Sequence, residues 1–523
     1  MTVDNPNSCA HPLDAQRRLI DALQHPNRYP HAVDSVRRIE THISILLLAG
    51  DYVYKIKKAV RLPFVDYGTL ERRRTCCEAE IRLNRRYAPD IYLDCVAVHA
   101  GPDGPSFADS GPVIEYAVRM ARFAPEAQGD VCARDGRITI ESVDGLAATI
   151  ARYHDHAPSP PPRPDYGSAE AVIATAKANL DEYRVLIDPT ESSIFTPLDR
   201  WMRERLARAA LSFEQRRAAG FVRECHGDMH LANLIYRTGY WEAFDCVEFD
   251  AALRWIDVMD DMAFTLMDLY AHGLVEPAHR FLNHYLEITG DYAGLAVLRL
   301  YLVHRALVRA KVALLGGAAQ PAGGNKPHYL DTARALSIER PRLVITHGIS
   351  GSGKSWAAER VAEHFGYVRI RSDIERKRLH GLPPLNHQRA GAFGRGMYSD
   401  QSSTATYDRL FELAEIALSE GWPVILDAAF LDTDLRDAAR AVAHHAGCPF
   451  HILDMDVSPE MARRRLRARG DSDASDANER ILDQQLARYR PLAPDERDDA
   501  LTTSGACSEL RALFESLESP ASA

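Results

Sequence analysis

Residues 348–355 read Gly-Ile-Ser-Gly-Ser-Gly-Lys-Ser and match the pattern GxxxxGK[ST] in full. An apolar run at 342–347 predicts a strand before this motif, and a helical pattern begins at Ser355. In that context the glycines let backbone N–H groups and a helix N-terminus surround phosphate groups. Lys354 is expected to reach the β- and γ-phosphate oxygens, and the Ser355 hydroxyl to bind Mg²⁺. The residues expected to bind the nucleotide are Gly348, Ser350, Gly351, Ser352, Gly353, Lys354 and Ser355.

After this P-loop, strand-like runs alternate with helical patterns: YVRIRSD, PVILDAAF and PFHILDMDV. Such alternation predicts a parallel sheet covered by helices, with ligands bound at the carboxyl ends of the strands. Asp373 and Arg376 follow the first of these runs in the sequence Asp-Ile-Glu-Arg, and Asp427 ends the apolar part of the second. We interpret Asp427 either as a carboxylate that organises Mg²⁺ or as a helix cap.

The order of Lys354-Ser355 followed by DxxR resembles the small P-loop kinases related to polynucleotide kinase, gluconate kinase and zeta toxin. The resemblance implies that Asp373 is the base for an attacking hydroxyl and that Arg376 holds a phosphate. It also implies a lid helix that brings an arginine to the transferring phosphoryl group. Arg465 and Arg469, in the run ARRRLRARG, are our candidates, whereas the other arginines of the run are expected to form a solvated helical face.

A second motif, HGDMHLAN, occupies residues 226–233. It places Asp228 five residues before Asn233, which is the spacing of the kinase catalytic loop. Asp245 follows one strand-like run later, where kinases carry a carboxylate that binds metal. The pattern predicts that Asp228 orients an acceptor hydroxyl and that Asn233 and Asp245 hold Mg²⁺.

Further upstream, two apolar runs flank Ala49-Gly50-Asp51 and predict a β-hairpin. Lys55 lies in the middle of the second run, and Glu80 lies in the helical pattern that follows. An ion pair between them would hold the lysine against the α- and β-phosphates. Lys57 shares the strand face of Lys55, and Glu78 is the alternative on the helix.

The order Lys55, Glu80, HGDMHLAN, Asp245 resembles the aminoglycoside phosphotransferase and choline kinase branch of the protein-kinase-like fold, over about residues 30 to 315. The resemblance implies a bilobal α+β domain and a carboxylate, matched here by Asp261, that supports the catalytic loop. The expected phosphate-covering turn at 38–44 lacks glycine, so the hydroxyls of Thr41 and Ser44 are candidate substitutes. Since an APE-type segment is missing after Asp245, a small molecule is favoured over a protein as the acceptor.

We therefore predict a multidomain chain: an α+β protein-kinase-like bilobal domain followed by an α/β P-loop domain with a parallel sheet. The expected bounds are 1–29 for an N-terminal extension, 30–335 for the kinase-like domain with its small lobe to about 123, and 336–523 for the P-loop domain. A Gly- and Pro-rich segment at 316–327 predicts a linker before the last domain. A length of 523 residues agrees with several folding units.

The composition of the chain argues against some classes of protein. The net charge of −10 argues against a protein that coats nucleic acid or anionic membrane. Nine scattered cysteines without a CxxC pair indicate reduced thiols, and neither a signal peptide nor a spanning segment is evident, so we expect a cytoplasmic location.

The sequence thus predicts an ATP-dependent and Mg²⁺-dependent enzyme with two kinase modules that phosphorylate hydroxyl groups of small molecules. Two alternatives stay open. One module could be an ATP-binding regulatory switch for the other, or the P-loop module could phosphorylate nucleic-acid 5′ ends.

Overall fold

The computed structural model describes residues 12–62, 65–108, 111–315, 328–383, 400–455, 457–468, 479–503 and 506–518. The chain divides into two compact units. The first consists of Met1–Arg137, Tyr153–Ser168 and Arg217–Asp261, and the second of Ile138–Arg152, Ala169–Arg216 and Met262–Ala523. Three helices contain residues of both units: α4 (Ile140–His156), α7 (Ala210–Ala218) and α8 (Val258–Ala271).

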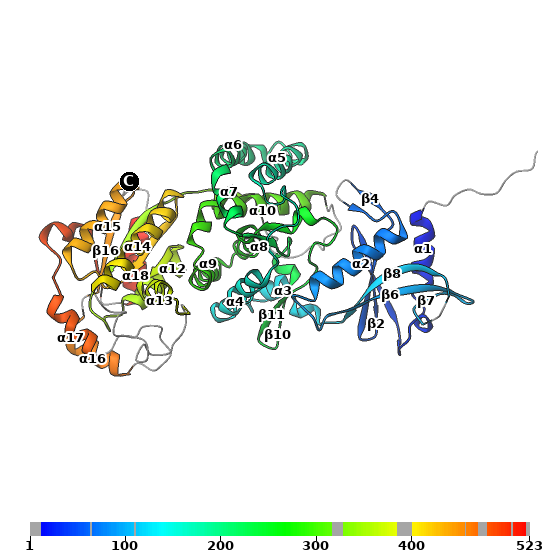
Figure 1. The fold of residues 1–523 in the computed structure, drawn as a ribbon, viewed down its shortest axis with the longest axis horizontal. Coiled ribbons are helices and arrows are strands. Elements are labelled where there is room, and N and C mark those ends of the chain that lie inside the picture. Colours follow the sequence, from blue (N-terminus) through cyan, green and yellow to red (C-terminus); the bar gives the residue numbers. More distant parts are fainter. Residues whose placement is uncertain are drawn as a thin grey trace, which may run out of the picture. The chain divides into compact units, whose positions relative to one another are not determined.

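The first unit is built around a six-stranded antiparallel sheet with the order β1-β2-β3-β8-β6-β7 (Figure 1). Its strands are β1 (Val36–Glu40), β2 (Ser44–Ala49), β3 (Tyr52–Lys57), β6 (Tyr92–Gly101), β7 (Gly104–Ser106) and β8 (Val113–Ala121). The predicted hairpin is confirmed: β2 pairs with β3 around Gly50, whose φ of +59° suits a glycine. The remaining elements are α1 (Pro12–Ala22), β4 (Arg61–Leu62), β5 (Val65–Asp66), α2 (Leu70–Asn84), α3 (Gly129–Arg134), β9 (Val222–Glu224), β10 (Leu234–Arg237), β11 (Tyr240–Ala243) and β12 (Trp255–Asp257).

The N-terminal segment contributes to the core of this sheet. Ile20 of α1 and Leu23 just after it are fully buried and pack in one apolar cluster with Leu47 and Ile56 of the hairpin. Gln16 adds a polar contact, since its side-chain amide donates to the backbone oxygen of Lys57 at 2.8 Å. The helix α1 therefore stabilises the strand that carries the predicted lysine.

The second unit contains a five-stranded sheet with the order β14-β15-β13-β16-β17, in which all pairs are parallel. The strands are β13 (Arg342–His347), β14 (Val368–Arg371), β15 (Pro423–Asp427), β16 (Phe450–Met455) and β17 (Ala500–Thr503). The helices of this part are α12 (Lys354–Phe365), α13 (Ser372–Leu379), α14 (Asp400–Ser419), α15 (Thr433–His445), α16 (Pro459–Ala468), α17 (Glu479–Arg488) and α18 (Cys507–Glu518). The predicted parallel, helix-covered sheet is confirmed.

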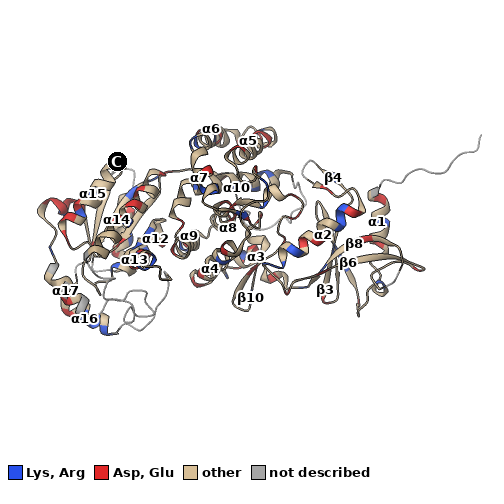
Figure 2. Cartoon of the chain, viewed as in Figure 1, with Lys and Arg blue, Asp and Glu red and all other residues tan. Residues whose placement is uncertain are grey.

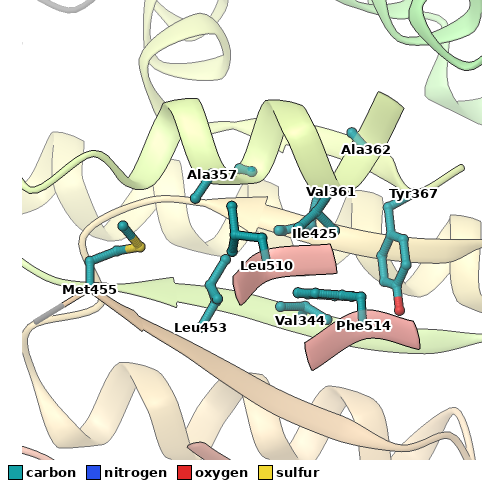
Figure 3. Packing of buried hydrophobic residues seen from close by; sticks show 11 residues of the cluster. Val344, Ala357, Val361, Ala362, Tyr367, Ile425, Leu453, Met455, Leu510 and Phe514 are labelled. Carbon is teal, nitrogen blue, oxygen red and sulfur yellow. The ribbon is translucent and has the colours of Figure 1, made fainter. Parts of the chain in front are cut away.

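One face of this sheet is covered by α12 and α18 (Figure 3). Val361 of α12 and Phe514 of α18 are buried against the sheet, where they meet Val344 of the central strand β13. Burial of this apolar layer holds β13 and α12 together, and the P-loop is the turn between them. The position of the loop is therefore set by the core.

The second unit also contains helices that precede the P-loop domain in the chain: α5 (Ala169–Leu186), α6 (Ser192–Arg208), α9 (Val275–Thr289), α10 (Leu295–Leu315) and α11 (Tyr329–Leu336). Of these helices, α6, α9 and α10 contact the P-loop domain directly. The indole N–H of Trp422, just before β15, donates to the backbone oxygen of Leu295 at 3.2 Å, and Arg299 lies 4.2 Å above the Trp422 ring. The predicted linker at 316–327 lies outside the described residues. Within the described part of the chain, no helix is long and apolar enough to cross a membrane.

Candidate functional site

In the first unit, β3 and α2 bring the predicted lysine and glutamate together. Lys55 Nζ donates to Glu80 Oε1 at 2.8 Å and also to the carboxylate of Asp245. Burial of Glu80 raises the pKa of its carboxyl, but Lys55 and Lys57 lower it more, to about 2, so the carboxylate is ionised. Glu78, the alternative on this helix, is exposed and pairs with Arg74.

Lys57 also binds Glu80, which distinguishes the two lysines. Its Nζ lies 2.6 Å from Glu80 Oε2 and donates to Glu248 as well. The Lys57 side chain is fully buried, whereas Lys55 is 11% exposed and reaches Asp245, whose side chain is 45% exposed. Lys55 is therefore the lysine that can meet a ligand, and Lys57 supports Glu80 from the interior.

The catalytic-loop motif folds around Asp228. Asn233 Nδ2 donates to the backbone oxygen of Asp228 at 2.9 Å and to its Oδ2 atom at 3.0 Å. The side chain of Asp228 remains 36% exposed, so it is accessible. The backbone of Asn233 accepts a hydrogen bond from the N–H of Phe244 at 3.0 Å, and this contact brings the loop beside the segment that carries Asp245.

Asp261 supports the loop that carries Asp228, in the role that the kinase resemblance implied. Its two carboxylate oxygens accept backbone N–H groups of His226 at 3.1 Å and Gly227 at 2.7 Å. Gly227 has a φ of +86°, and a Cβ there would lie 2.5 Å from the backbone oxygen of Leu253. The glycine of the motif is thus required by the fold, and buried Asp261 fixes its backbone.

Asp245 has an unusual backbone. Its φ of +64° is rare for a residue with a side chain, and its N–H donates to the hydroxyl of Tyr92 at 2.9 Å. Such positions are retained where the surrounding structure enforces them and often mark functional sites. By contrast, Thr41 uses its hydroxyl within its own turn, where it accepts the N–H of Ser44 at 3.0 Å.

Other charged side chains of the first unit have partners within the protein. Glu224 accepts hydrogen bonds from Arg82 and Arg254 at 3.1 Å each, which connects β9 to α2. Asp257 accepts the N–H of Met259 at 2.9 Å. Figure 2 likewise shows basic and acidic segments alternating along α2.

In the second unit, the P-loop connects β13 to α12 with glycines in left-handed conformations. Gly351 has a φ of +83°, and a Cβ on it would lie 2.6 Å from the backbone oxygen of Ala462. Lys354 Nζ donates to the backbone oxygen of Ile349 at 2.7 Å, so the lysine side chain folds over the loop. The Ser355 hydroxyl donates to Asp427 Oδ1 at 3.0 Å. A hydroxyl beside an ionised carboxylate suits Mg²⁺, which prefers oxygen ligands.

Asp427 ends β15 and pairs in parallel register with Arg371 of β14. Burial raises the pKa of its carboxyl, but Arg369 and Arg371 lower it more, and the net shift is downward. The N-cap of the next helix, α15, is Asp432. The helix-cap alternative for Asp427 is therefore wrong.

The DxxR residues lie at the same edge of the sheet. Asp373 is in the first turn of α13, directly after β14, and Arg376 Nη1 lies 3.5 Å from the Ser403 hydroxyl of α14. Their catalytic roles stay predictions.

Of the two candidate lid arginines, Arg465 contacts the P-loop. Its Nη1 donates to the backbone oxygen of Ser352 at 2.9 Å. The neighbouring Arg463 instead pairs with Asp483 at 2.7 Å, as expected for a solvated helical face. Arg469 lies outside the described residues.

Comparison with known proteins gives matches over most of the chain. The uncharacterized protein Rv2004c of Mycobacterium tuberculosis (strain ATCC 25618 / H37Rv) is 30% identical over 444 residues, which cover 83% of this chain and 87% of the relative. This chain belongs to the family of Rv2004c. In addition, a family model described as an AAA domain matches residues 343–492.

Two solved structures are each similar to part of the chain. A gluconokinase from Sinorhizobium meliloti 1021 is 21% identical, and the match covers 34% of this chain and 95% of that chain with a TM-score of 0.25. A choline kinase from Cryptosporidium parvum Iowa II is 10% identical, with 61% and 94% covered and a TM-score of 0.39.

Several residues at the two sites were missed by the sequence reasoning. In the second unit they are Arg369, which binds Asp427 at 2.7 Å, and Gln485, whose side chain accepts the N–H of Ser350 at 2.7 Å. In the first unit the missed residue is Glu248, which pairs with Lys57. Arg369 carried a signal, because two arginines alternate with the buried residues Val368 and Ile370 in the four-residue strand β14. The contact of Gln485 depends on chain far from the P-loop, which no local pattern reveals.

Proposed function

We propose that this chain is an ATP-dependent phosphotransferase with two kinase modules, each of which transfers a γ-phosphate to a hydroxyl group of a small molecule. One observation carries the proposal. In each unit an acidic side chain suited to a metal lies within hydrogen-bond reach of a phosphate-binding group, Asp245 beside Lys55 and Asp427 beside Ser355.

In the first module, Lys55 holds the phosphates and Glu80 keeps the lysine in place. Asp228 accepts a hydrogen bond from the acceptor hydroxyl and orients it, while Asn233 fixes the rotamer of Asp228. Mg²⁺, when bound by Asp245 and Asn233, neutralises charge on the phosphate oxygens. Most of the catalysis in such a site comes from positioning and from electrostatic stabilisation.

In the P-loop module, backbone N–H groups and Lys354 surround the phosphates. Asp373 serves as the base for the second acceptor, and Arg376 holds its phosphate or the transferring group. Arg465, which already touches the P-loop, stabilises negative charge that develops during transfer. Ser355 and Asp427 hold Mg²⁺ in this module.

Small molecules are the proposed acceptors. The net charge of −10 is unfavourable for binding a nucleic-acid strand, which requires clustered cations. The pairing of Arg463 with Asp483 supports this proposal, because that cation is already compensated.

The test uses γ-labelled ATP, Mg²⁺ and an extract of small metabolites, followed by identification of the labelled products. Asp228→Ala and Asp373→Ala are each expected to remove a different labelled product, because each removes the residue that orients one acceptor. Asp165→Ala and Asp437→Ala, at exposed positions of the first and second units, are the matched controls. If the double variant Asp228→Ala/Asp373→Ala labels the same products as the wild type, the proposal is wrong. Loss of every product from one change alone would favour the regulatory-switch alternative.

A further inference from the structure

One buried arginine, Arg369, contacts both residues that are expected to hold the metal. Arg369 Nη2 donates to Asp427 Oδ2 at 2.7 Å, and Nε donates to the same oxygen at 3.1 Å. Nη2 also donates to the backbone oxygen of Ser355 at 3.0 Å. The other carboxylate oxygen, Oδ1, then faces the Ser355 hydroxyl at 3.0 Å. The guanidinium thus fixes the orientation of the carboxylate relative to the serine.

Arg369 is itself held by a helix from outside the P-loop domain. Its backbone N–H donates to Asn283 Oδ1 of α9 at 2.7 Å, and Asn283 Nδ2 donates to the backbone oxygen of Tyr367 at 3.0 Å. The side chain of Asn283 therefore hydrogen-bonds to the backbone on both sides of Val368, the first residue of β14. This contact fixes where β14, and with it the Arg369 side chain, lies relative to β15.

A second chain of charges reaches Arg369 from the same helix. Arg280 of α9 binds Asp144 through two hydrogen bonds at 2.7 and 2.8 Å and also pairs with Glu359 of α12. Glu359 Oε1 in turn lies 3.7 Å from Arg369 Nη1. Arg369 therefore has carboxylates on two sides, and its remaining freedom to move away from Asp427 is small.

The alternative explanation is an ion pair that only fills the interior. Burial of a charged pair has a desolvation cost that its attraction roughly balances, so such pairs are poor devices for stability alone. Here the Arg369 guanidinium binds Asp427, the carboxylate that also accepts the hydrogen bond of the Ser355 hydroxyl. Partners of this kind, which orient a metal ligand without touching the metal, tune metal affinity in many sites.

We propose that Arg369 is a positioning residue of the P-loop site, which holds Asp427 toward Ser355 and is itself held in place by Asn283 of α9. The proposal rests on the proposed ATP-binding function of this module. It makes α9, a helix that lies before the P-loop domain in the sequence, a structural part of the P-loop metal site.

The test measures ATP binding by calorimetry in the full chain carrying Lys55→Ala and Asp245→Ala, so that the first module does not contribute. Arg369→Gln is expected to weaken binding of ATP with Mg²⁺ by roughly 10–100-fold, the range found for residues behind metal ligands. Binding of ATP in EDTA should change little, because the phosphate-binding backbone is unaltered. A purely structural role would weaken both equally. Unchanged binding of ATP with Mg²⁺ in Arg369→Gln overturns the proposal.

Arg369→Lys keeps the charge but cannot bind Asp427 and Ser355 together. Its affinity for ATP with Mg²⁺ should lie between that of Arg369→Gln and that of the parent chain. If Arg369→Gln does not fold and Arg369→Lys binds like the parent, the two-point contact is unnecessary and the positioning role is wrong.

Asn283→Ala removes the contact from α9 without touching the metal site. It should weaken binding of ATP with Mg²⁺ in the same selective way, whereas the half-buried neighbour change His284→Ala should not. Equal binding in Asn283→Ala and the parent overturns the part of the proposal that concerns α9. Lys354→Ala distinguishes failure of the proposed function from failure of the positioning role. If Lys354→Ala also leaves ATP binding intact, the proposed function of the P-loop module is wrong. If Lys354→Ala abolishes ATP binding and Arg369→Gln does not weaken it, only the positioning role is wrong.

Discussion

Lys55 Nζ lies 2.8 Å from Glu80 Oε1, and the second oxygen of this carboxylate is occupied by Lys57. The two lysines extend to Asp245 and Glu248, which belong to one short segment after β11. Five side chains of alternating charge thus connect β3, α2 and the segment that carries the predicted metal ligand. Because Glu80 is at the centre of this chain, it controls the position of both lysines.

Replacement of Glu80 by Gln should destabilise the first unit and weaken its binding of ATP. The change leaves two buried ammonium groups with fewer anionic partners, and removal of one member of a buried ion pair costs roughly 3–5 kcal/mol. Urea unfolding of wild type and variant measures this difference. Glu78→Gln, on the exposed face of the same helix, should change the unfolding free energy by less than about 0.5 kcal/mol. Equal losses in both variants would contradict the account of the shared carboxylate.

Asp261→Asn should slow phosphate transfer by the first module and leave transfer by the P-loop module unchanged. Asp261 accepts hydrogen bonds from two backbone N–H groups, and an asparagine would place its own N–H group against one of them. Because two donors cannot bond to each other, the loop that carries Asp228 has to shift. A displacement of that kind costs roughly 10–100-fold in turnover. The measurement is the rate of formation of the Asp228-dependent product, with the Asp373-dependent product as the internal control. Parallel loss of both products would indicate general misfolding instead.

His304 on α10 predicts a pH dependence of stability in the second unit. Burial lowers the pKa of this imidazole to about 3, and the nearby Arg305 and Lys311 act in the same direction. Since the folded-state pKa lies below the unfolded value of about 6.5, the unfolded chain binds the proton first, and stability falls as pH decreases through the window from 6.5 to 3. Between pH 7 and pH 5 the loss from this residue is on the order of 2 kcal/mol.

The measurement for His304 is urea unfolding of wild type and His304→Gln at pH 7 and pH 5. The variant should lose less stability between the two pH values than the wild type does. His156→Gln, at an exposed position, should follow the wild type. A wild-type pH dependence that persists in His304→Gln would show that other groups cause it.

Phe514→Ala tests the core on which the P-loop is placed. Phe514 is fully buried between α18 and the sheet, as Figure 3 shows, and loss of such a ring costs roughly 3–5 kcal/mol. Thermal unfolding and ATP binding should both be affected, because the same layer holds β13 and α12. Leu211→Ala, whose side chain is exposed on α7, is the matched control and should change stability by less than about 0.5 kcal/mol.

Local patterns predicted much of the fold and part of the sites. The turn at Gly50, the parallel strands and the P-loop follow from residue types at short spacing, and the structure confirms those elements. The pair of Lys55 and Glu80 was also anticipated from element order. The network behind these residues was not, because Glu248 and Asn283 act through contacts with residues about 80 to 190 positions away. Long-range partners of this kind depend on packing, which sequence spacing does not specify.

The central claim is that the chain carries two separate ATP sites, and nucleotide stoichiometry tests it most directly. Equilibrium dialysis with labelled ATP and Mg²⁺ should give two nucleotides bound per chain. Lys354→Ala and Lys55→Ala should each reduce this number to one, and the double variant should bind none. A single nucleotide per wild-type chain, or two that persist in the double variant, would contradict the account.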